Sequence, residues 1–276
     1  MDPGTHPVAA GFDRVADRYE RGRPDYPTAA VDFLAESLGI RPGRTVLDVG
    51  AGTGKFTREI LRYGAAVTAV EPMPQMRARF TERLPTVPLL VGTAEHLPVP
   101  DAGVDAITCA QAFHWFETAA AAREFVRVLR PGGGVGLIWN IRDERVPWVH
   151  ELTTILDRYD AGGPRGRSQA WRRPLEETGL FTPIEHRAFE HVQRAPVETI
   201  VDRALSVSYI GILPPETQAA IADQVRALLA RSEETRDRAE ITLPYRTDAF
   251  VLHCKGDGTA AAEVAARRLR RPSVAT

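Results

Sequence analysis

The chain has 276 residues and 43% hydrophobic side chains, enough to bury the core of one large domain or of a domain with a cap. Its 35 basic side chains nearly balance 36 acidic ones, and the net charge of -1 gives no overall field for nucleic acid or an anionic membrane. Its two cysteines, Cys109 and Cys254, cannot form a disulfide framework and have no metal-ligand spacing. With no signal-peptide pattern and no apolar run of about 18 residues, we expect a cytoplasmic protein without a metal ion or a membrane span.

Residues 1–40 predict two helices joined by a loop. Phe12, Val15 and Tyr19 recur at helical spacing, and prolines and a glycine in residues 21–27 break regular structure. The loop carries two arginines and a tyrosine, which are groups able to hold an anion or an aromatic ring. It is interpreted either as part of a lid over a ligand or as a solvated linker with a structural tyrosine.

Residues 46–71 have the pattern of a βαβ unit that holds a nucleoside. A short apolar run suited to a buried parallel strand is followed by Gly50, Gly52 and Gly54, which permit a tight turn and close approach of the backbone to a ligand. A predicted helix and a second apolar run then lead to Glu71. A carboxylate at this strand end can accept hydrogen bonds from both hydroxyls of a ribose.

The run 47–54, Leu-Asp-Val-Gly-Ala-Gly-Thr-Gly, together with Glu71, resembles the first two motifs of class I methyltransferases that use S-adenosylmethionine (SAM). In that family the glycine turn lies against the amino-acid and ribose parts of SAM. The resemblance implies an α/β fold with a Rossmann-like, seven-stranded, mostly parallel sheet that has one antiparallel strand. Helices are expected on both faces of the sheet, with a helical cap, and S-adenosylhomocysteine as the product.

Residues 92–98, Gly-Thr-Ala-Glu-His-Leu-Pro, follow a third predicted strand and resemble the loop that holds adenine in this family. Thr93 replaces the usual aspartate, so a carboxylate contact to the adenine amine is not expected. Backbone groups at Ala94 and Glu95 can still contact the adenine edge. Met76 lies on a predicted helix just before this loop, where it either touches the cofactor or packs in the core.

Residues 111–116, Gln-Ala-Phe-His-Trp-Phe, follow a fourth predicted strand, and ligands of open α/β sheets gather at such strand ends. The segment resembles a signature of a branch that includes trans-aconitate methyltransferase-like proteins, and the resemblance extends over residues 12–255. His114 is the candidate general base because an unperturbed histidine titrates near pH 6.5, with a structural ring as the alternative.

The residues expected at the cofactor come from the glycine turn, the strand-end acid and the loops that follow later strands. They are Tyr19, Asp48, Gly50, Ala51, Gly52, Thr53, Gly54, Glu71, Pro72, Met76, Thr93, Ala94, Glu95, Gln111 and Ala112. The residues expected to line the acceptor pocket are mostly aromatic or basic. They are Arg21, Arg23, Tyr26, His114, Trp115, Asn140, Arg142 and Tyr209.

Two of the acceptor-pocket residues, His114 and Tyr209, are candidate catalytic groups. Arg21, Arg23 and Arg142 are candidates for a clamp on an acceptor carboxylate, although exposed arginines are commonly only solvated. An elaborate set of catalytic residues is not expected, because the methyl group of SAM is already activated.

The second half of the chain predicts the rest of the sheet and an insertion. Residues 130–134, Arg-Pro-Gly-Gly-Gly, indicate a turn before a fifth strand over 134–139, and the Gly- and Arg-rich residues 160–168 indicate a mobile lid or a solvated linker. The runs 184–192 and 241–254 predict an antiparallel hairpin whose strands are separated by helical segments.

Four parts of the chain are therefore expected. Residues 1–40 form N-terminal helices and a lid, 41–142 a SAM-binding core, and 143–255 the rest of the sheet with a cap inserted at about 195–239. Residues 256–276 form a C-terminal tail.

The expected function is methyl transfer from SAM to O, N or C of a small organic acceptor, such as a carboxylate or a natural-product intermediate. One alternative is an enzyme that cyclises or transfers the aminocarboxypropyl chain of SAM, and another is a non-catalytic SAM-binding protein. Nucleic-acid methylation is disfavoured because residues 110–113 read Ala-Gln-Ala-Phe, where base-modifying families carry Asn/Asp-Pro-Pro-aromatic. A dinucleotide oxidoreductase is disfavoured by the short glycine spacing. Monomer and homo-oligomer both stay open.

Overall fold

A computed structural model describes residues 16–160, 162–163 and 166–255. The helix expected from Phe12 begins outside the described residues, and the expected tail at 256–276 lies entirely outside them. None of the helices in the described ranges is long and apolar enough to cross a membrane.

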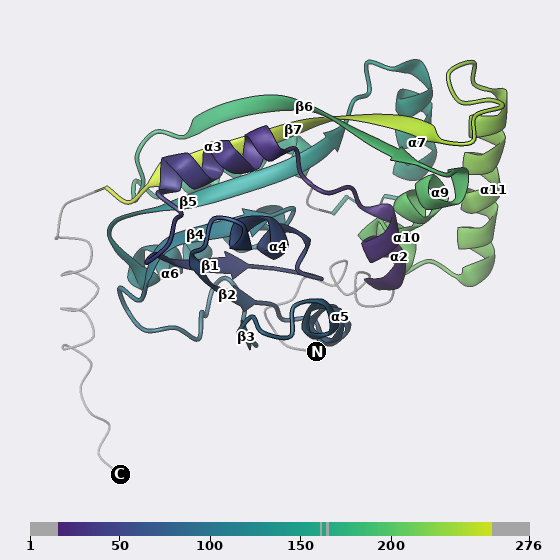
Figure 1. Cartoon of the computed structure of the whole chain (residues 1–276). Helices are drawn as coiled ribbons and strands as arrows, with labels where there is room; N and C mark the ends of the chain where they lie inside the picture. The colour runs from purple at the N-terminus through teal and green to yellow at the C-terminus, as the bar shows by residue number, and fades with distance from the viewer. Residues whose placement is uncertain (1–15, 161, 164–165, 256–276) are drawn as a thin grey trace, which may run out of the picture.

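Seven strands form one sheet in the order β3-β2-β1-β4-β5-β7-β6 (Figure 1). The strands are β1 Thr45–Val49, β2 Ala66–Val70, β3 Leu89–Leu90, β4 Val104–Ala110, β5 Leu129–Arg142, β6 Glu185–Ala195 and β7 Ile241–His253. Strand β7 pairs antiparallel with both β5 and β6, whereas the pairs from β3 to β5 are parallel. The expected sheet with one antiparallel strand is confirmed.

Helices cover both faces of the sheet and also build the cap. The core helices are α3 Thr28–Leu38, α4 Lys55–Leu61, α5 Pro74–Arg83, α6 Thr118–Val128 and α8 Arg172–Glu177. The remaining helices are α2 Ala16–Gly22, α7 Pro147–Asp157, α9 Val197–Leu205, α10 Ser208–Gly211 and α11 Pro215–Arg231, with short 3-10 turns at η1 Phe113–Trp115 and η2 Gly166–Ser168.

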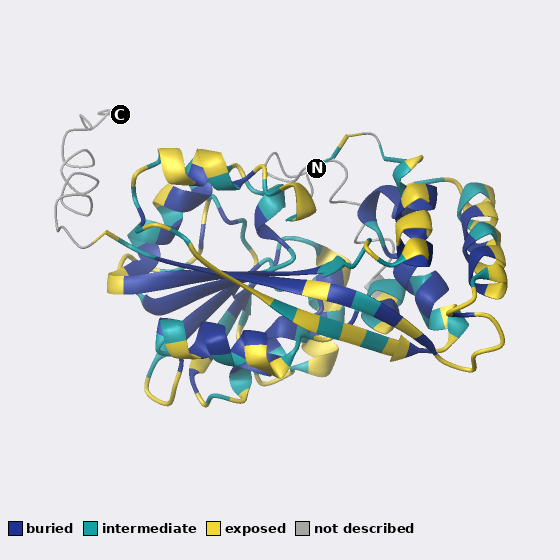
Figure 2. Cartoon of the chain, turned by 90° about the horizontal axis from the view of Figure 1, so that it is seen from above, coloured by how far each residue is buried: buried dark blue, intermediate teal, exposed yellow. Residues whose placement is uncertain are grey.

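Neighbouring residues of β1 face opposite helical layers, as the alternation of side chains along a strand requires. Val46 belongs to a buried cluster with Leu34 of α3, whereas Leu47 belongs to a cluster with Phe125 of α6. Each such fully buried side chain stabilises the fold by about 1.5–3 kcal/mol. Figure 2 shows the resulting arrangement, with buried strands between two layers of helices.

The start of β5 differs from the expectation. The strand begins at Leu129, so the turn expected at 130–134 lies inside it. Leu129 pairs with Val104, and the pairing resumes when Gly134 meets Ala106, so the residues in between form an irregular bulge. Because Leu129 is buried and makes this extra pair, the strand starts before the proline and glycines that indicated a turn.

The cap has a hydrophobic core of its own. Side chains from α7, α9, α10 and α11 pack with the outer ends of β6 and β7, for example Leu152, Val201, Ile210 and Val225 against Leu243. The two long strands run from the sheet into the cap in both views (Figures 1 and 2). Helix α7 and these strand ends therefore pack with the insertion expected at about 195–239.

Helix α2 lies between the core and the cap. Toward the core, Asp17 pairs with Arg79 of α5 at 2.6 Å. Toward the cap, Arg18 donates to Gln218 of α11 at 2.6 Å. At Gly22 the backbone of α2 meets α9 so closely that an added Cβ would lie 2.5 Å from the backbone nitrogen of Arg203.

We expect Gly22→Ala to destabilise the protein by about 1–3 kcal/mol, because the methyl group would overlap the backbone of α9. Helix propensity alone predicts the opposite sign, since alanine favours a helix by about 1 kcal/mol over glycine. Urea unfolding would measure the change. An unchanged or raised midpoint would show that α2 and α9 can separate at this point without cost.

Candidate functional site

Three adjoining cavities follow the carboxyl ends of the central strands. The loop cavity is lined by Val49, Gly50, Pro72, Gly92, Thr93, Ala94, Glu95 and Phe116. The central cavity is lined by Tyr19, Gly50, Gly52, Glu71, Pro72, Met73, Met76, Ala110, Gln111, Ala112, Trp115 and Phe116. The cap cavity is lined by Tyr19, Arg23, Gln111, His114, Trp115, Trp139, Asn140, Ile141, Arg142, Glu144, Gly166, Arg167, Arg203, Val207, Ser208 and Tyr209. The cavities adjoin one another, because each shares lining residues with the next.

The glycine turn after β1 needs its glycines for two separate reasons. Gly50 has a left-handed φ of +68°, and an added Cβ would lie 2.7 Å from the Cβ of Ala112. Gly52 has a φ of +59° with open space where a side chain would be, and it lines the central cavity. The turn thus brings bare backbone to the cavity wall.

Glu71 is fixed at the end of β2 by two backbone donors. Its Oε2 accepts from the backbone nitrogen of Gly52 at 2.8 Å, and its Oε1 accepts from that of Met73 at 2.9 Å. The side chain is buried and lines the central cavity. Each carboxylate oxygen can accept more than one hydrogen bond, so both can also serve a ligand hydroxyl.

Asp48 lies beneath the turn and lines none of the three cavities. Its carboxylate accepts hydrogen bonds from Thr57 Oγ1 at 2.5 Å and Thr108 Oγ1 at 2.8 Å, joining β1 to α4 and β4. Burial raises the pKa of Asp48 to about 6, against the hydrogen bonds of the two threonines.

The segment after β4 forms the wall between the central and cap cavities. Gln111 has a left-handed φ of +58°, which is uncommon for a residue other than glycine. Its side-chain Nε2 donates to the carbonyl oxygen of Asn140 at 3.3 Å. Asn140 in turn donates to the carbonyl oxygen of Asp25 at 3.0 Å and accepts from Thr247 Oγ1 at 2.6 Å. These bonds tie the wall to the loop before α3 and to β7.

His114 lies on η1 with one ring nitrogen already engaged. The indole Nε1 of Trp139 donates to His114 Nδ1 at 3.1 Å. Burial, and to a smaller extent the positive charge of Arg23, lowers the pKa of His114 to about 3. The ring is therefore neutral at physiological pH with its proton on Nε2, because Nδ1 acts as the acceptor. This geometry favours His114 as a hydrogen-bond donor over a general base.

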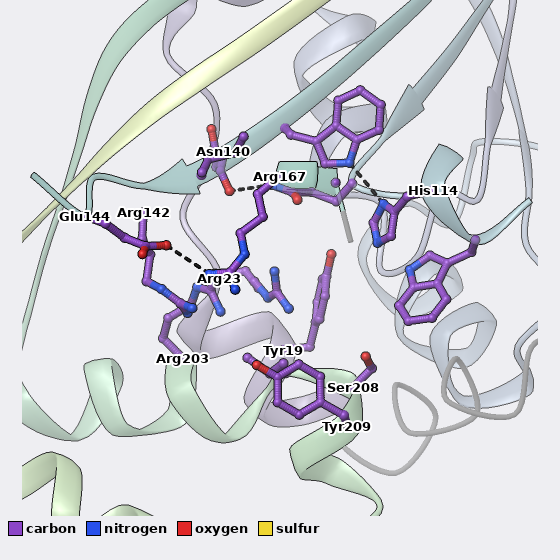
Figure 3. Close-up of a pocket in the computed structure, with 16 residues that line it drawn as sticks. Tyr19, Arg23, His114, Asn140, Arg142, Glu144, Arg167, Arg203, Ser208 and Tyr209 are labelled. Atoms are coloured by element: carbon purple, nitrogen blue, oxygen red, sulfur yellow. Dashed lines mark hydrogen bonds and ion pairs between the residues drawn. The ribbon is translucent and has the colours of Figure 1, made fainter. Parts of the chain in front are cut away.

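Three arginines gather on the side of the cap cavity away from His114 (Figure 3). Arg23 donates through Nε to Ser206 Oγ at 3.3 Å, and Arg142 donates through Nε to Thr153 Oγ1 at 3.1 Å. Arg203 of α9 donates to the hydroxyl of Tyr245 at 3.2 Å. Within the described ranges, no carboxylate lies within ion-pair distance of any of the three.

Burial and mutual repulsion act on these arginines. The pKa values of Arg23 and Arg142 are each lowered to about 10, first by burial and then by the charge of Arg203. Arg203 is only 5% exposed, and its Nη1 has no hydrogen-bond partner among the described residues. In contrast, the neighbouring Arg167 is neutralised by Glu144 at 2.9 Å and by Asp157.

Comparison with known proteins decides the family. A family model for a methyltransferase domain matches residues 47–136. An uncharacterized methyltransferase from Mycobacterium bovis is 39% identical over 240 residues, covering 87% of this chain and 94% of that protein. An uncharacterized methyltransferase-like protein from Schizosaccharomyces pombe is 35% identical over 237 residues, covering 86% of this chain and 92% of that protein. The chain belongs to the class I SAM-dependent methyltransferases.

Solved structures support the fold of this methyltransferase. The YcgJ protein of Bacillus subtilis covers 83% of the chain with a TM-score of 0.53 at 21% identity, and that protein is matched over 99% of its length. The [4+2]-cyclase SpnF covers 84% of the chain, and 84% of itself, with a TM-score of 0.51 at 18% identity. At these identities the likeness concerns architecture alone.

The residues present at the central and loop cavities fit SAM. The bare backbone at Gly52 and the fixed carboxylate of Glu71 suit a ribose, and the aromatic side chains of Tyr19, Trp115 and Phe116 suit a sulfonium. The predicted cofactor residues that line the central cavity are Tyr19, Gly50, Gly52, Glu71, Pro72, Met76, Gln111 and Ala112, and those that line the loop cavity include Thr93, Ala94 and Glu95. Contact of each with SAM stays a prediction.

Four other predicted cofactor residues line none of the cavities. Asp48 braces the turn from below, and Gly54 backs onto α5, where an added Cβ would lie 2.7 Å from Leu84. Ala51 and Thr53 also lie outside the three linings. The turn therefore presents alternate residues to the ligand and the others to the protein.

Arg21 and Tyr26, which were expected in the acceptor pocket, line none of the three cavities. Arg21 is 59% exposed and bonds Asp202 at 2.8 Å on the outer side of α2. The ring of Tyr26 packs edge-on against Phe56, with ring centroids 4.9 Å apart. Arg23, His114, Trp115, Asn140, Arg142 and Tyr209 do line the cap cavity. Tyr209 directs its hydroxyl to Asp157 at 3.4 Å.

Sequence reasoning missed Arg203. It is three residues after Ile200 and one before Ala204, so it shares the buried stripe of α9. A charged residue within an apolar stripe was the available signal. The expected lid or linker at 160–168 also supplies cavity wall, since Gly166 lies against Trp139 and Arg167 lines the cavity.

We expect Glu71→Ala to weaken SAM binding by about 1.5–3 kcal/mol, or roughly 10- to 150-fold, because it removes charge-assisted hydrogen bonds. Isothermal calorimetry on the purified chain would measure this. Glu82→Ala is the matched control, since Glu82 is an exposed acid on α5 that pairs with Arg79 at 2.7 Å. Wild-type affinity in the Glu71 variant would mean that the ribose binds elsewhere.

We expect His114 to remain neutral, with its proton on Nε2, from neutral pH down to about pH 4. Its pKa in the folded chain, about 3, lies below the unfolded value. Its contribution to stability is therefore complete above about pH 6.5 and is lost as the pH falls toward 3. Long-range proton–nitrogen spectra of the imidazole would report both tautomer and charge. Protonation near pH 6.5 would contradict the buried acceptor geometry.

Proposed function

We propose that this SAM-dependent methyltransferase methylates a small organic acid bound in the cap cavity by Arg23, Arg142 and Arg203. The observation that carries the proposal is a set of three guanidinium groups, one buried (Arg203) and two half-buried (Arg23 and Arg142), with no carboxylate partner among the described residues. The cavity is open to solvent on one side and is lined by polar, charged and aromatic side chains, as pockets for small ligands commonly are.

Charge compensation is the physical argument for an anionic acceptor. Isolated buried charges cost several kcal/mol of stability, and proteins normally pair them. Arg23 and Arg142 remain cationic at neutral pH, because their lowered pKa values are still about 10. An acidic ligand supplies the missing partner, and a planar guanidinium fork binds a carboxylate through two parallel hydrogen bonds.

The chemistry of the neighbouring groups favours an acceptor that needs no deprotonation. When bound, SAM supplies a methyl group already activated on a sulfonium. A carboxylate oxygen is a nucleophile at neutral pH, so its methylation needs no general base. His114 suits this role as a donor, because its Nε2 proton can orient an acceptor oxygen while its Nδ1 is held by Trp139.

The parts of the chain divide between the two ligands in this proposal. Residues 41–142 hold SAM, and the cap of α7 and about 195–239 selects the acceptor. The N-terminal part, described from residue 16, contributes Tyr19 to both cavities and Arg23 to the cap cavity. A small acid also agrees with the resemblance of residues 110–116 to the trans-aconitate methyltransferase-like branch.

A relative with a named acceptor matches only about half of the chain. The demethylmenaquinone methyltransferase of Beutenbergia cavernae is 34% identical over 139 residues, which cover 48% of this chain and 58% of that protein. A match over about half of each chain does not transfer the acceptor in that protein's name to this one.

Incubation with methyl-labelled SAM and a panel of organic acids, followed by mass spectrometry, would test the proposal. We expect S-adenosylhomocysteine together with a labelled methyl ester. Release of methylthioadenosine instead would identify transfer or cyclisation of the aminocarboxypropyl chain. Labelling only of neutral or cationic acceptors would overturn the proposal of an acid.

We expect Arg142→Gln and Arg203→Gln each to raise the acceptor KM by about 10- to 150-fold, as loss of a charged hydrogen-bond partner predicts. Steady-state kinetics and SAM calorimetry would show a raised KM with nearly unchanged SAM affinity. Arg226→Gln is the control, because Arg226 lies on the cap surface and pairs with Glu198 at 2.7 Å. An unchanged acceptor KM in both cavity variants would contradict the anion site.

A further inference from the structure

We propose that Arg23 couples the two ligands electrostatically, so that an anion in the cap cavity strengthens the binding of cationic SAM but not of uncharged S-adenosylhomocysteine. This inference rests on the proposed function. It adds a specific role for Arg23: the charge of this residue makes the affinity for one ligand depend on the charge of the other.

The position of Arg23 carries the first step. Tyr19 lines both the central and the cap cavity, and the guanidinium carbon of Arg23 lies 4.8 Å from the centroid of the Tyr19 ring. One aromatic side chain therefore separates a fixed positive charge from the cavity that fits the sulfonium. Figure 3 shows Tyr19 between the arginines and His114.

Arg23 cannot easily move its charge away from this wall. Its Nη2 donates to the carbonyl oxygen of Ser206 at 3.4 Å, in addition to the bond from Nε to the Ser206 hydroxyl. Its backbone nitrogen donates to the carbonyl oxygen of Tyr19 at 3.0 Å. The preceding Gly22 accepts from Gln193 at 2.8 Å and abuts the backbone of α9. The guanidinium is thus held by Ser206 of the cap, and the backbone that carries it is held by α2.

The charges around the two cavities do not compensate Arg23. Of the described residues that line the central cavity, Glu71 is the sole acid, and its oxygens are directed to backbone donors and fit a ribose. On the cap side, Glu144 is engaged by Arg167. The effect of Arg23 on the pKa of His114 shows that its field reaches the segment that also carries Trp115 of the central cavity.

An empty cap cavity therefore presents net positive charge to a cationic donor. Two unit charges about 10 Å apart, at an effective dielectric constant of 20 to 40, change a binding constant by about fourfold to fifteenfold. An anion beside Arg23 cancels this repulsion, and by reciprocity SAM strengthens binding of the anion by the same factor. Methyl transfer to a carboxylate removes both the positive charge of the sulfonium and the negative charge of the acid. The products then lose the attraction that held the substrates together.

Calorimetry with SAM and S-adenosylhomocysteine on the full chain would test the coupling, with inorganic sulfate as the probe anion against chloride at matched ionic strength. For the wild type, we expect sulfate to raise SAM affinity severalfold and to leave that of S-adenosylhomocysteine unchanged. For Arg23→Gln, we expect SAM affinity in chloride to rise severalfold and the sulfate effect to shrink. Retained binding of S-adenosylhomocysteine would show that this variant is folded.

Arg18→Gln is the matched control, because Arg18 lies on the same helix, bonds Gln218 and lines none of the three cavities. We expect it to behave as the wild type. If Arg23→Gln left the ratio of SAM to S-adenosylhomocysteine affinity unchanged, the coupling would be wrong while the methyltransferase function stood. If the wild type bound neither compound, the proposed function itself would fail.

Discussion

The reversal of strand order between β1 and β4 determines where ligands bind. From β1 the chain adds β2 and β3 on one side and then returns to place β4 and β5 on the other. The connections on the two sides leave in opposite directions, so a crevice opens at the carboxyl ends of β1 and β4. The glycine turn follows one of these strands and the segment with Gln111 follows the other. The position of the central cavity follows from this strand order, and the cap adds a second cavity beside it.

Much of the lining of the central cavity could be predicted from the sequence because its determinants are local. Gly50, Gly52 and Glu71 are specified by a turn and two strand ends, and each lies where the spacing indicated. The same spacing could not separate residues that face the ligand from those that brace the turn. Asp48 is an example, since its role depends on Thr57 and on Thr108 of another strand.

The acceptor half was predicted less well because it depends on packing between distant segments. Arg203 joins the site only because α9 rests against α2, and Arg21 leaves it because that helix turns the side chain outward. Burial also changed the interpretation of His114. Burial, and then the charge of Arg23, lowers its pKa from about 6.5 to about 3. Its hydrogen-bond partner, Trp139, is not identified by any local pattern. The family model also ends at residue 136, before the cap begins.

The long strands β6 and β7 have a mechanical consequence for substrate choice. They pair without a break from Glu185–Val251 at the sheet to Ala195–Ile241 in the cap, so the cap rests on the same pair of strands as the core. Neither of these two strands is interrupted by a loop between the sheet and the cap. A continuous ladder of this kind resists bending, so we expect the cap to keep its position relative to the sheet. The cap cavity would then select acceptors whose size and charge fit it as it stands, and little closure of the cap on the acceptor would be expected.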